Sequence, residues 1–218
     1  MAFIVFEGGE GVGKSTQIDR LFKALQHKHK ACCRTREPGG TPFAENIRGL
    51  FKTIDAHSDA PLPLTELLLI AAARHQHIQK LIKPELNKGT IVLCDRFVDS
   101  TYVYQNIVGG VSKQVVDDIL GVVLDEICPD LTFVFTATLE NSLARIHKEK
   151  SRVSDRLDSY DESVHAAIHK GYFTVFDTPY AYPSGKVPHR ILVDANASIE
   201  QVFDVIQSAV AQHLGINL

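Results

Sequence analysis

The chain has 218 residues, of which 44% are hydrophobic and 22% are charged, and this composition excludes a disordered or fibrous protein. Its formal net charge of −3 provides no general attraction to nucleic acid or to an anionic membrane, so any phosphate-binding site must be local. The length favours one domain over residues 1–218, and the longest hydrophobic stretch, Leu67 to Ala73, is far shorter than the about 20 residues that span a bilayer. We therefore expect a soluble protein with no nucleic-acid or membrane partner.

The N-terminus and the cysteines favour a cytoplasmic location. The first residues, MAFIVFEGG, contain no basic leader and no cleavage-site pattern, so we expect no secretory signal. The cysteines form no Cys-x-x-Cys pair, and we expect reduced thiols. Cys32 and Cys33 are adjacent in a predicted strand, where successive side chains point to opposite faces, so packing explains this pair better than redox chemistry.

Short β-rich segments alternate with longer helical patterns along the chain, which is typical of a mostly parallel sheet covered by helices. The predicted strands are residues 3–7, 31–36, 90–95, 131–137 and 190–195. Because these segments are almost continuously apolar, we expect them to be buried on both faces. The sequence thus predicts an α/β fold with a five-stranded parallel sheet and helices on both faces.

Two helices are predicted from their apolar stripes. The first places apolar residues at i, i+3, i+4 and i+7, namely Ile18, Leu21, Phe22 and Leu25. The last begins at a capping box formed by Ser198 and Gln201 and ends at Gly215. Its apolar face consists of Ile199, Val202, Phe203, Ile206 and Val210. We expect this last helix to be purely structural.

The segment GGEGVGKST at residues 8–16 matches the pattern Gly-x-x-x-x-Gly-Lys-Ser between a predicted strand and a predicted helix. Glycines allow backbone N–H groups to surround a phosphate, and the helix N-terminus adds partial positive charge. We expect Lys14 to bridge the β- and γ-phosphates and the Ser15 hydroxyl to bind Mg²⁺. The pattern predicts a P-loop NTPase-type three-layer fold, with an ATP site formed by Gly8, Gly9, Glu10, Gly11, Val12, Gly13, Lys14, Ser15 and Thr16.

A P-loop alone does not distinguish kinases from switch GTPases or mechanical ATPases. The sequence contains no Asn-Lys-x-Asp segment for guanine, and no predicted strand ends in paired acidic residues that would polarise a hydrolytic water. The third predicted strand ends instead in Asp95, which is followed by Arg96. We expect Asp95 to support the Mg²⁺ shell and Arg96 to contact a second anion.

Three further segments are predicted to lie near the P-loop, at the edge of the sheet where open α/β folds bind ligands. They are TREPGGT at 35–41, AAAR at 71–74 and DRFVDSTYVYQ at 95–105. Together with the P-loop, these motifs resemble the thymidylate kinase family, in the family's order and from Phe3 to the region of Arg156. The resemblance implies transfer of a phosphoryl group from ATP, with Mg²⁺, to thymidine 5′-monophosphate (dTMP), giving the diphosphate for dTTP synthesis. It also implies a homodimer.

The resemblance assigns roles to the acceptor residues. Arg48 and Arg96 match arginines that hold the acceptor phosphate, and Arg74 matches the arginine that reads a thymine carbonyl. Tyr104 matches an aromatic residue that packs on deoxyribose and disfavours a 2′-hydroxyl, and Glu10 matches an acidic position near the acceptor sugar. The predicted substrate site comprises Glu10, Glu37, Pro38, Gly39, Arg48, Ile70, Arg74, Arg96, Ser100, Thr101, Tyr104 and Gln105.

Two details of this site concern the monophosphate pocket and the base. The turn from Glu37 to Gly40 lines the pocket in the family, and its Glu37–Pro38 bond is a candidate for cis geometry. Many members carry an aromatic residue four positions before the equivalent of Arg74, where it stacks on thymine, whereas this chain has Ile70. Base stacking is then weaker or supplied elsewhere.

The substitution at Ile70 leaves alternatives open. One is a kinase for another pyrimidine deoxynucleotide, such as deoxyuridylate, or for a deoxynucleoside. Another is a non-catalytic nucleotide-binding module, which a P-loop by itself would allow but which leaves the three acceptor arginines and Tyr104 without a shared purpose.

The charged segment from Lys148 to Tyr160 has the composition of an exposed surface turn. In the thymidylate kinase family a mobile lid closes over ATP, here at about residues 145–160. Members with glycine at the position of Gly11 carry in this lid the arginine that neutralises charge on the transferring phosphoryl group. The predicted catalytic residues are Lys14, Arg96, Arg145, Arg152 and Arg156.

The histidine pairs His75/His77 and His165/His169 do not predict a metal site. Residues two apart on a helix do not share a face, and an isolated i, i+4 pair is more often a solvated face than a ligand pair. The predicted metal ligands are therefore Ser15 and Asp95.

Overall fold

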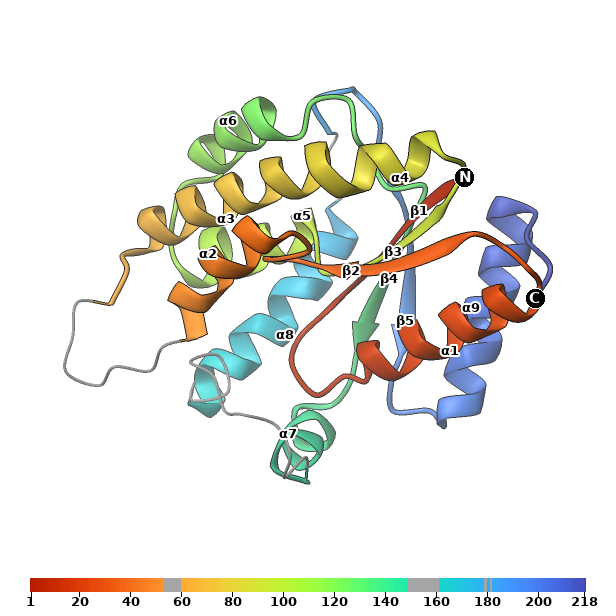
Figure 1. The fold of residues 1–218 in the computed structure, drawn as a ribbon. Coiled ribbons are helices and arrows are strands. Elements are labelled where there is room, and N and C mark those ends of the chain that lie inside the picture. The colour runs from red at the N-terminus through yellow and green to blue at the C-terminus, as the bar shows by residue number, and fades with distance from the viewer. Residues whose placement is uncertain (53–59, 149–160, 179, 181) are drawn as a thin grey trace.

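The structure is a computed structural model that describes residues 1–52, 60–148, 161–178, 180 and 182–218. A parallel sheet forms the middle of three layers, with helices on both faces (Figure 1). Its strands are β1 (Ala2–Gly8), β2 (Cys32–Arg36), β3 (Ile91–Asp95), β4 (Leu131–Thr136) and β5 (His189–Asp194). The helices are α1 (Lys14–His27), α2 (Pro42–Lys52), α3 (Pro63–His77), α4 (Lys83–Asn87), α5 (Val98–Thr101), α6 (Lys113–Val123), α7 (Leu139–Lys148), α8 (Glu162–Asp177) and α9 (Ile199–Leu214). Two π-helical segments, η1 (Ile78–Ile82) and η2 (Tyr102–Val108), continue α3 and α5.

The sheet confirms the predicted fold class and all five predicted strands. The strand order is β2-β3-β1-β4-β5, and every neighbouring pair is parallel. Central strand β1 pairs with β3 in a register that places Phe6 opposite Asp95. The P-loop after β1 and the Asp95–Arg96 segment at the end of β3 are therefore neighbours at the carboxyl edge of the sheet.

Burial on both faces holds for the central strands only. All residues of β1 and β4 are buried, as are all of β3 except Asp95. The prediction was wrong for β2, which has no fully buried residue, and for β5, where only Val193 is buried. These two strands form the edges of the sheet, where each has one neighbouring strand and incomplete cover.

Two hydrophobic clusters hold the helices to the opposite faces of the sheet. One joins α1 and α9 to the sheet and includes Leu21, Leu25 and Ile206, all with no exposed surface. The other joins α3, α6 and α8 to the opposite face and includes Leu67 and Tyr172. Cys32 packs against the first cluster and Cys33 against the second, which confirms the packing interpretation of the adjacent cysteines.

The two predicted helices are confirmed with small corrections. In α1, Ile18, Leu21 and Leu25 are buried and Phe22 is partly buried. The capping box of Ser198 and Gln201 is formed, and α9 ends at Gly215 with a φ of 65°. Ile199 was wrongly assigned to the packed face: it is 51% exposed because it begins α9, one turn before the first buried residue of that face.

The run from Leu67 to Ala73 forms part of α3 and is not uniformly core. Leu67, Ala71 and Ala73 are buried, whereas Leu68 is 53% exposed, because helical geometry turns part of any continuous apolar run away from the sheet. No helix among the described residues is long and apolar enough to cross a membrane.

Candidate functional site

The P-loop connects β1 to α1, and its glycines are required by its shape. Gly11 and Gly13 have φ angles of 71° and 87°, in the left-handed region that favours glycine. A Cβ atom on Gly11 would also collide with the carbonyl oxygen of Ser142 in α7. The close approach of α7 thus gives a structural reason for glycine at this position, since an arginine there would require α7 to move.

Lys14 is the first residue of α1, and its side chain is buried against the loop. Its Nζ donates hydrogen bonds to the carbonyl oxygens of Gly8 and Gly9, both at 2.9 Å, and lies 3.9 Å from Oδ1 of Asp95. Burial, followed by repulsion from Arg96, lowers the pKa of Lys14. The carbonyl groups of the loop therefore hold this ammonium group where a P-loop binds phosphate.

Asp95 and Ser15 provide two oxygen groups beside the P-loop. Both line a pocket of about 380 Å³, and the Ser15 side chain is exposed to it. Oδ1 of Asp95 is buried and accepts no hydrogen bond from the described residues. Carboxylate and hydroxyl oxygens suit Mg²⁺, which completes its shell with water and phosphate oxygens, so these two residues fit the predicted metal. Elsewhere in the described ranges, no group of three or more His, Cys, Asp or Glu residues is arranged to hold a metal ion.

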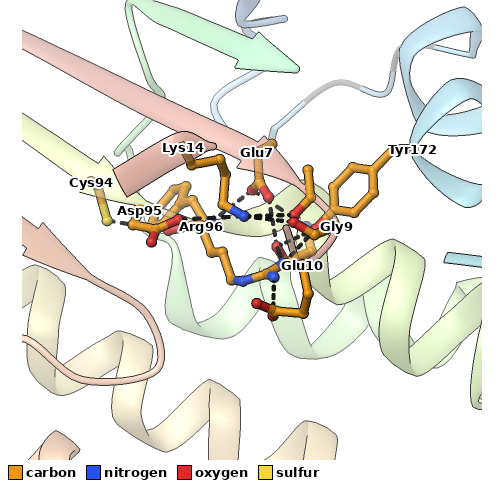
Figure 2. A network of polar contacts seen from close by, with 11 residues as sticks. Glu7, Gly9, Glu10, Lys14, Cys94, Asp95, Arg96 and Tyr172 are labelled. Atoms are coloured by element: carbon orange, nitrogen blue, oxygen red, sulfur yellow. Dashed lines mark hydrogen bonds and ion pairs between the residues drawn. The ribbon is translucent and has the colours of Figure 1, made fainter. Parts of the chain in front are cut away.

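Arg96 connects the P-loop to the acceptor segments (Figure 2). Its Nη2 donates to Oε1 of Glu10 at 2.5 Å, and its Nη1 donates to the hydroxyls of Tyr172 at 2.8 Å and Ser100 at 3.3 Å. The guanidinium also lies 5.1 Å from the centroid of the Tyr104 ring. Burial alone would lower the pKa of Arg96, yet the two tyrosines and Glu10 raise it well above its usual value. Arg96 is therefore a permanent cation.

Glu7, the residue before Gly8, is completely buried and supports the same segment. Its Oε1 accepts hydrogen bonds from the backbone N–H groups of Phe97 at 2.7 Å and Ser100 at 3.3 Å, and its Oε2 accepts the Ser100 hydroxyl at 2.6 Å. Burial, followed by repulsion from Asp99, raises the pKa of Glu7 to about 7. This carboxyl group ties the end of β1 to the chain that follows β3.

Arg74 in α3 forms a buried ion pair with Glu37. Its Nε donates to Oε2 of Glu37 at 2.6 Å, its Nη1 to the Thr101 hydroxyl at 2.9 Å and its Nη2 to the carbonyl oxygen of Phe97 at 2.7 Å. Both charged side chains are 2% exposed. Burial raises the pKa of Glu37, but Arg74 and His77 outweigh that effect and lower it. The ion pair therefore persists at neutral pH.

The turn after β2 contains the Glu37–Pro38 peptide bond, which the sequence made a candidate for cis geometry. This bond is cis in the structure. Arg48 in α2 donates from Nη1 to the carbonyl oxygen of Pro38 at 3.1 Å. Gly39 has a φ of 141°, and the N–H of Gly40 donates to Oε1 of Glu45 at 3.0 Å. Arg48 thus lies beside the turn.

The remaining predicted acceptor residues lie on α3 and η2. Ile70 is partly buried, one turn before Arg74. Tyr104 is partly buried and meets the Tyr172 ring edge to face, with centroids 6.5 Å apart. Gln105 is buried, with its Nε2 at 3.5 Å from a carboxylate oxygen of Glu66. Tyr104 and Gln105 follow Arg96 and Thr101 along one continuous helical segment, whereas Ile70 comes from α3.

Of the three candidate lid arginines, the structure describes Arg145 in α7. Its Nη1 donates to the carbonyl oxygen of Gly11 at 3.5 Å and its Nη2 to that of Ala195 at 2.8 Å. Arg145 therefore contacts the P-loop. Arg152 and Arg156 lie outside the described residues, as does most of the predicted lid.

Comparisons with known proteins agree with this arrangement. The family model described as "Thymidylate kinase" matches residues 6–206. The chain belongs to the thymidylate kinase family. Proteins named thymidylate kinase from Halalkalibacterium halodurans and Geobacter sulfurreducens are 37% and 36% identical to it, covering 98% and 91% of both chains, respectively. A crystal structure of thymidylate kinase from Ehrlichia chaffeensis superposes with a TM-score of 0.73, at 26% identity, over 96% of this chain and 98% of that one.

Family membership establishes the reaction. The chain is a nucleoside monophosphate kinase that uses ATP to phosphorylate thymidine 5′-monophosphate to the diphosphate. Thymidylate kinases generally use a divalent metal in this reaction. The Arg96–Glu10 ion pair joins the P-loop to the segment after β3, and the hydrogen bond from Arg74 to Thr101 joins that segment to the Glu37–Arg74 pair.

Sequence reasoning missed several residues that hold this site together. Glu7 left a signal, because it is the single charged residue in an otherwise apolar strand. His77 left a weaker one, since it follows Arg74 by three positions and so shares its helix face. Tyr172 and Asp99 gave no signal in the sequence, because their hydrogen-bond partners Arg96 and Arg190 are far away along the chain.

Proposed function

We propose that this chain transfers the γ-phosphoryl group of MgATP directly to a phosphate oxygen of dTMP, with the P-loop as donor site and the Glu37–Arg48–Arg74 region as acceptor site. The observation that carries this proposal is the ion pair between Arg96 and Glu10 at 2.5 Å. It joins a residue of the P-loop to the segment that follows β3, and this supports a common site for both substrates at one edge of the sheet.

On the donor side, the P-loop from Gly8 to Thr16 surrounds the phosphates of ATP and Lys14 neutralises them. Ser15 and Asp95 hold Mg²⁺, a role supported by their position on one pocket and by the buried Oδ1 of Asp95. When bound there, Mg²⁺ would supply positive charge that offsets the charge of the phosphate groups. The low pKa of Lys14 is a consequence of its burial, and an incoming polyphosphate would favour its charged form.

On the acceptor side, Arg48 and Arg96 hold the phosphate of dTMP, and Arg74 reads the base. Ser100 and Thr101 lie beside the base, Tyr104 packs on the deoxyribose, and Glu10 faces the sugar. Three contacts support these roles: Arg48 reaches the Pro38 carbonyl, Arg96 bonds Glu10, and Arg74 bonds Thr101. Ile70 replaces an aromatic stacking residue with aliphatic contact.

The chemistry requires alignment and charge neutralisation rather than a covalent enzyme intermediate. An oxygen of the dTMP phosphate attacks the γ-phosphorus of ATP as the bond to the β-phosphate oxygen breaks, which yields dTDP and ADP. Lys14 and Arg96 neutralise the charge that develops. An arginine of the lid region, from Arg145, Arg152 and Arg156, adds the last positive charge, a contribution worth about three to five orders of magnitude in related reactions. The contact of Arg145 with Gly11 supports its candidacy.

A coupled assay of ADP release across nucleoside monophosphates tests the proposal. We expect dTMP to give the highest kcat/KM, and chelation of divalent cations to abolish turnover. A preference for deoxyuridylate or for a deoxynucleoside would instead indicate that Ile70 has changed the acceptor. Turnover that no acceptor stimulates would indicate a nucleotide-binding module.

We further infer a homodimer in the cytoplasm. Exposed apolar side chains lie on the adjacent helices α2 and α3, namely Phe43, Leu50, Leu64 and Leu68. An exposed apolar surface of this kind favours contact with a second copy of the chain. All four cysteines are free, which suits a reducing compartment. Light scattering on the purified protein measures its molar mass in solution, and the mass of a single chain would contradict the homodimer.

A further inference from the structure

We propose that His77 is a positioning residue for base selection, which fixes Glu37 in the orientation that aims Arg74 at the acceptor base. The inference rests on the acceptor role proposed above for Arg74. His77 does not touch the substrate in this proposal. It acts through a buried relay of Thr35, His77, Glu37 and Arg74 that runs from β2 to the acceptor pocket.

The relay is continuous, and its members His77, Glu37 and Arg74 are buried while Thr35 is partly buried. His77 has no exposed surface, and Nδ1 of its ring lies 3.0 Å from Oε1 of Glu37. The other carboxylate oxygen, Oε2, accepts the 2.6 Å hydrogen bond from Nε of Arg74. On the far side of the ring, Nε2 lies 2.6 Å from the hydroxyl oxygen of Thr35. Each of the two Glu37 oxygens therefore has its own partner from α3.

The ionised carboxylate of Glu37 determines which ring nitrogen of His77 carries the proton. Because Arg74 and His77 lower the pKa of this carboxyl group despite its burial, Glu37 is ionised and only accepts hydrogen bonds. Nδ1 of His77 must then carry the proton that it donates to Glu37. In a neutral ring, Nε2 is left as an acceptor, and the Thr35 hydroxyl donates to it. Glu37 thus selects the tautomer, and the Thr35 hydroxyl completes it by donating to Nε2.

His77 also supports the acceptor turn by packing. A Cβ atom on Gly40 would collide with the His77 ring and with the Thr35 hydroxyl. The ring therefore fills the space directly behind the turn from Glu37 to Gly40. A smaller side chain at position 77 would release the turn and leave Oε1 of Glu37 without this donor in a buried position.

The orientation of Arg74 matters because its side chain can donate hydrogen bonds but cannot accept them. A guanidinium carries five N–H donors and no acceptor. Three donors are engaged by Glu37, Thr101 and Phe97, and our proposal assigns the other two to the acceptor base. Those donors suit the carbonyl oxygen at C4 of thymine and oppose the amino group at C4 of cytosine. Loosening Glu37 should therefore weaken discrimination between dTMP and dCMP before it weakens ATP binding.

Two amide substitutions separate this role from simple core packing. In His77→Asn, the side-chain nitrogen falls close to the position of Nδ1 and can still donate to Glu37. In His77→Gln, it falls close to Nε2 and can contact Thr35 but not Glu37. We expect the ratio of kcat/KM for dTMP to that for dCMP to fall about tenfold in His77→Gln, the equivalent of one charged hydrogen bond, and to change less than threefold in His77→Asn. The KM for ATP should stay within about twofold in both, since the P-loop is untouched.

The matched control is His75→Ala, an exposed histidine two positions earlier on the same helix, which should leave the ratio unchanged. If His77→Gln does not fold, Thr35→Val tests the same relay without altering α3, and we expect about a threefold loss of the ratio. Equal losses in His77→Asn and His77→Gln, or a ratio that Thr35→Val and His77→Gln leave intact, would overturn the positioning role. Failure of the wild-type enzyme to prefer dTMP would instead refute the proposed acceptor function.

Discussion

The proposed donor and acceptor sides of this kinase are built in different ways. The donor side is one continuous segment, Gly8 to Thr16, whose shape comes from glycine conformations and whose lysine is held by the carbonyl groups of its own loop. The acceptor side is assembled from β2, α3 and the chain after β3, which meet through buried side-chain pairs such as Arg74 with Glu37. Local backbone chemistry shapes the first, and long-range side-chain chemistry shapes the second.

This difference predicts two kinds of failure. Substitutions on the donor side should remove catalysis or distort a loop, with limited effect on distant parts of the protein. Substitutions on the acceptor side should leave a buried charge without its partner, and so should lower stability and substrate recognition together. Four substitutions test this distinction between the two sides, and they follow in decreasing order of predicted effect.

Replacing Lys14 with alanine should lower kcat by about three orders of magnitude, because the charge on the transferring phosphoryl group loses a buried cation. Stability should fall little, since the lysine donates hydrogen bonds only to carbonyl groups of its own loop and its ion pair with Asp95 is long, at 3.9 Å. The coupled ADP assay and a thermal melt check both parts. Lys23→Ala, an exposed lysine on the same helix, is the control. A kcat within tenfold of wild type would show that Lys14 is not part of the donor chemistry.

Replacing Arg74 with alanine should cost about 3–5 kcal/mol of the free energy of unfolding, because it leaves the Glu37 carboxylate buried without its guanidinium partner. The KM for dTMP should rise in the same variant. Urea unfolding measures the stability. Arg20→Ala removes an exposed pair with Glu200 and should cost less than about 1 kcal/mol. Similar losses in the two variants would argue against a side-chain-built acceptor side.

Replacing Glu7 with glutamine should change how stability depends on pH. The pKa of Glu7 is about 7 in the folded protein, above its ordinary value of 4.5, so the unfolded chain loses this proton first. Its contribution is fully present below pH 4.5 and is lost as pH rises to about 7, by about 3 kcal/mol in total. Urea unfolding from pH 5 to pH 8 should show this decline in wild type and a flatter profile in Glu7→Gln. The exposed Glu200→Gln should keep the wild-type slope, and an unchanged slope in Glu7→Gln would refute the assignment.

Replacing Gly11 with alanine should cost about 1–3 kcal/mol, because the residue has a positive φ and its new Cβ would press on the Ser142 carbonyl. The KM for ATP should rise while the dTMP-to-dCMP preference stays constant. Gly121→Ala in α6 is the matched control: nothing lies within 4 Å of its added Cβ, so the change should stabilise the protein slightly. A loss of base preference in Gly11→Ala would mean that the two sides are not separable.

The fold could be predicted closely from the sequence. Short, almost continuously apolar segments identified all five strands, and the glycine pattern between a strand and a helix identified the P-loop, because both signals lie within short segments. Burial of β2 and β5 was predicted wrongly, since an apolar run does not reveal whether its strand lies at the centre or at the edge of the sheet.

The candidate site was predicted unevenly. Motif resemblance located Arg74, Arg96 and Thr101, and the structure brings the first and last into contact. The same reasoning considered His77 only as a metal ligand and rejected it, without detecting its bond to Glu37. Glu7 was passed over as the end of a strand, although it accepts three hydrogen bonds from the segment after β3.

The family, the phosphate-binding loop and the positions of the five strands along the chain could be predicted from the sequence alone, because each depends on local patterns of residue type and spacing. The folded structure was needed to show which charges are paired, which carboxyl groups are buried and that Arg96 and Arg145 contact the P-loop. Those properties depend on side chains brought together from positions far apart in the chain, and a pKa or an ion pair arises from that proximity rather than from either residue alone.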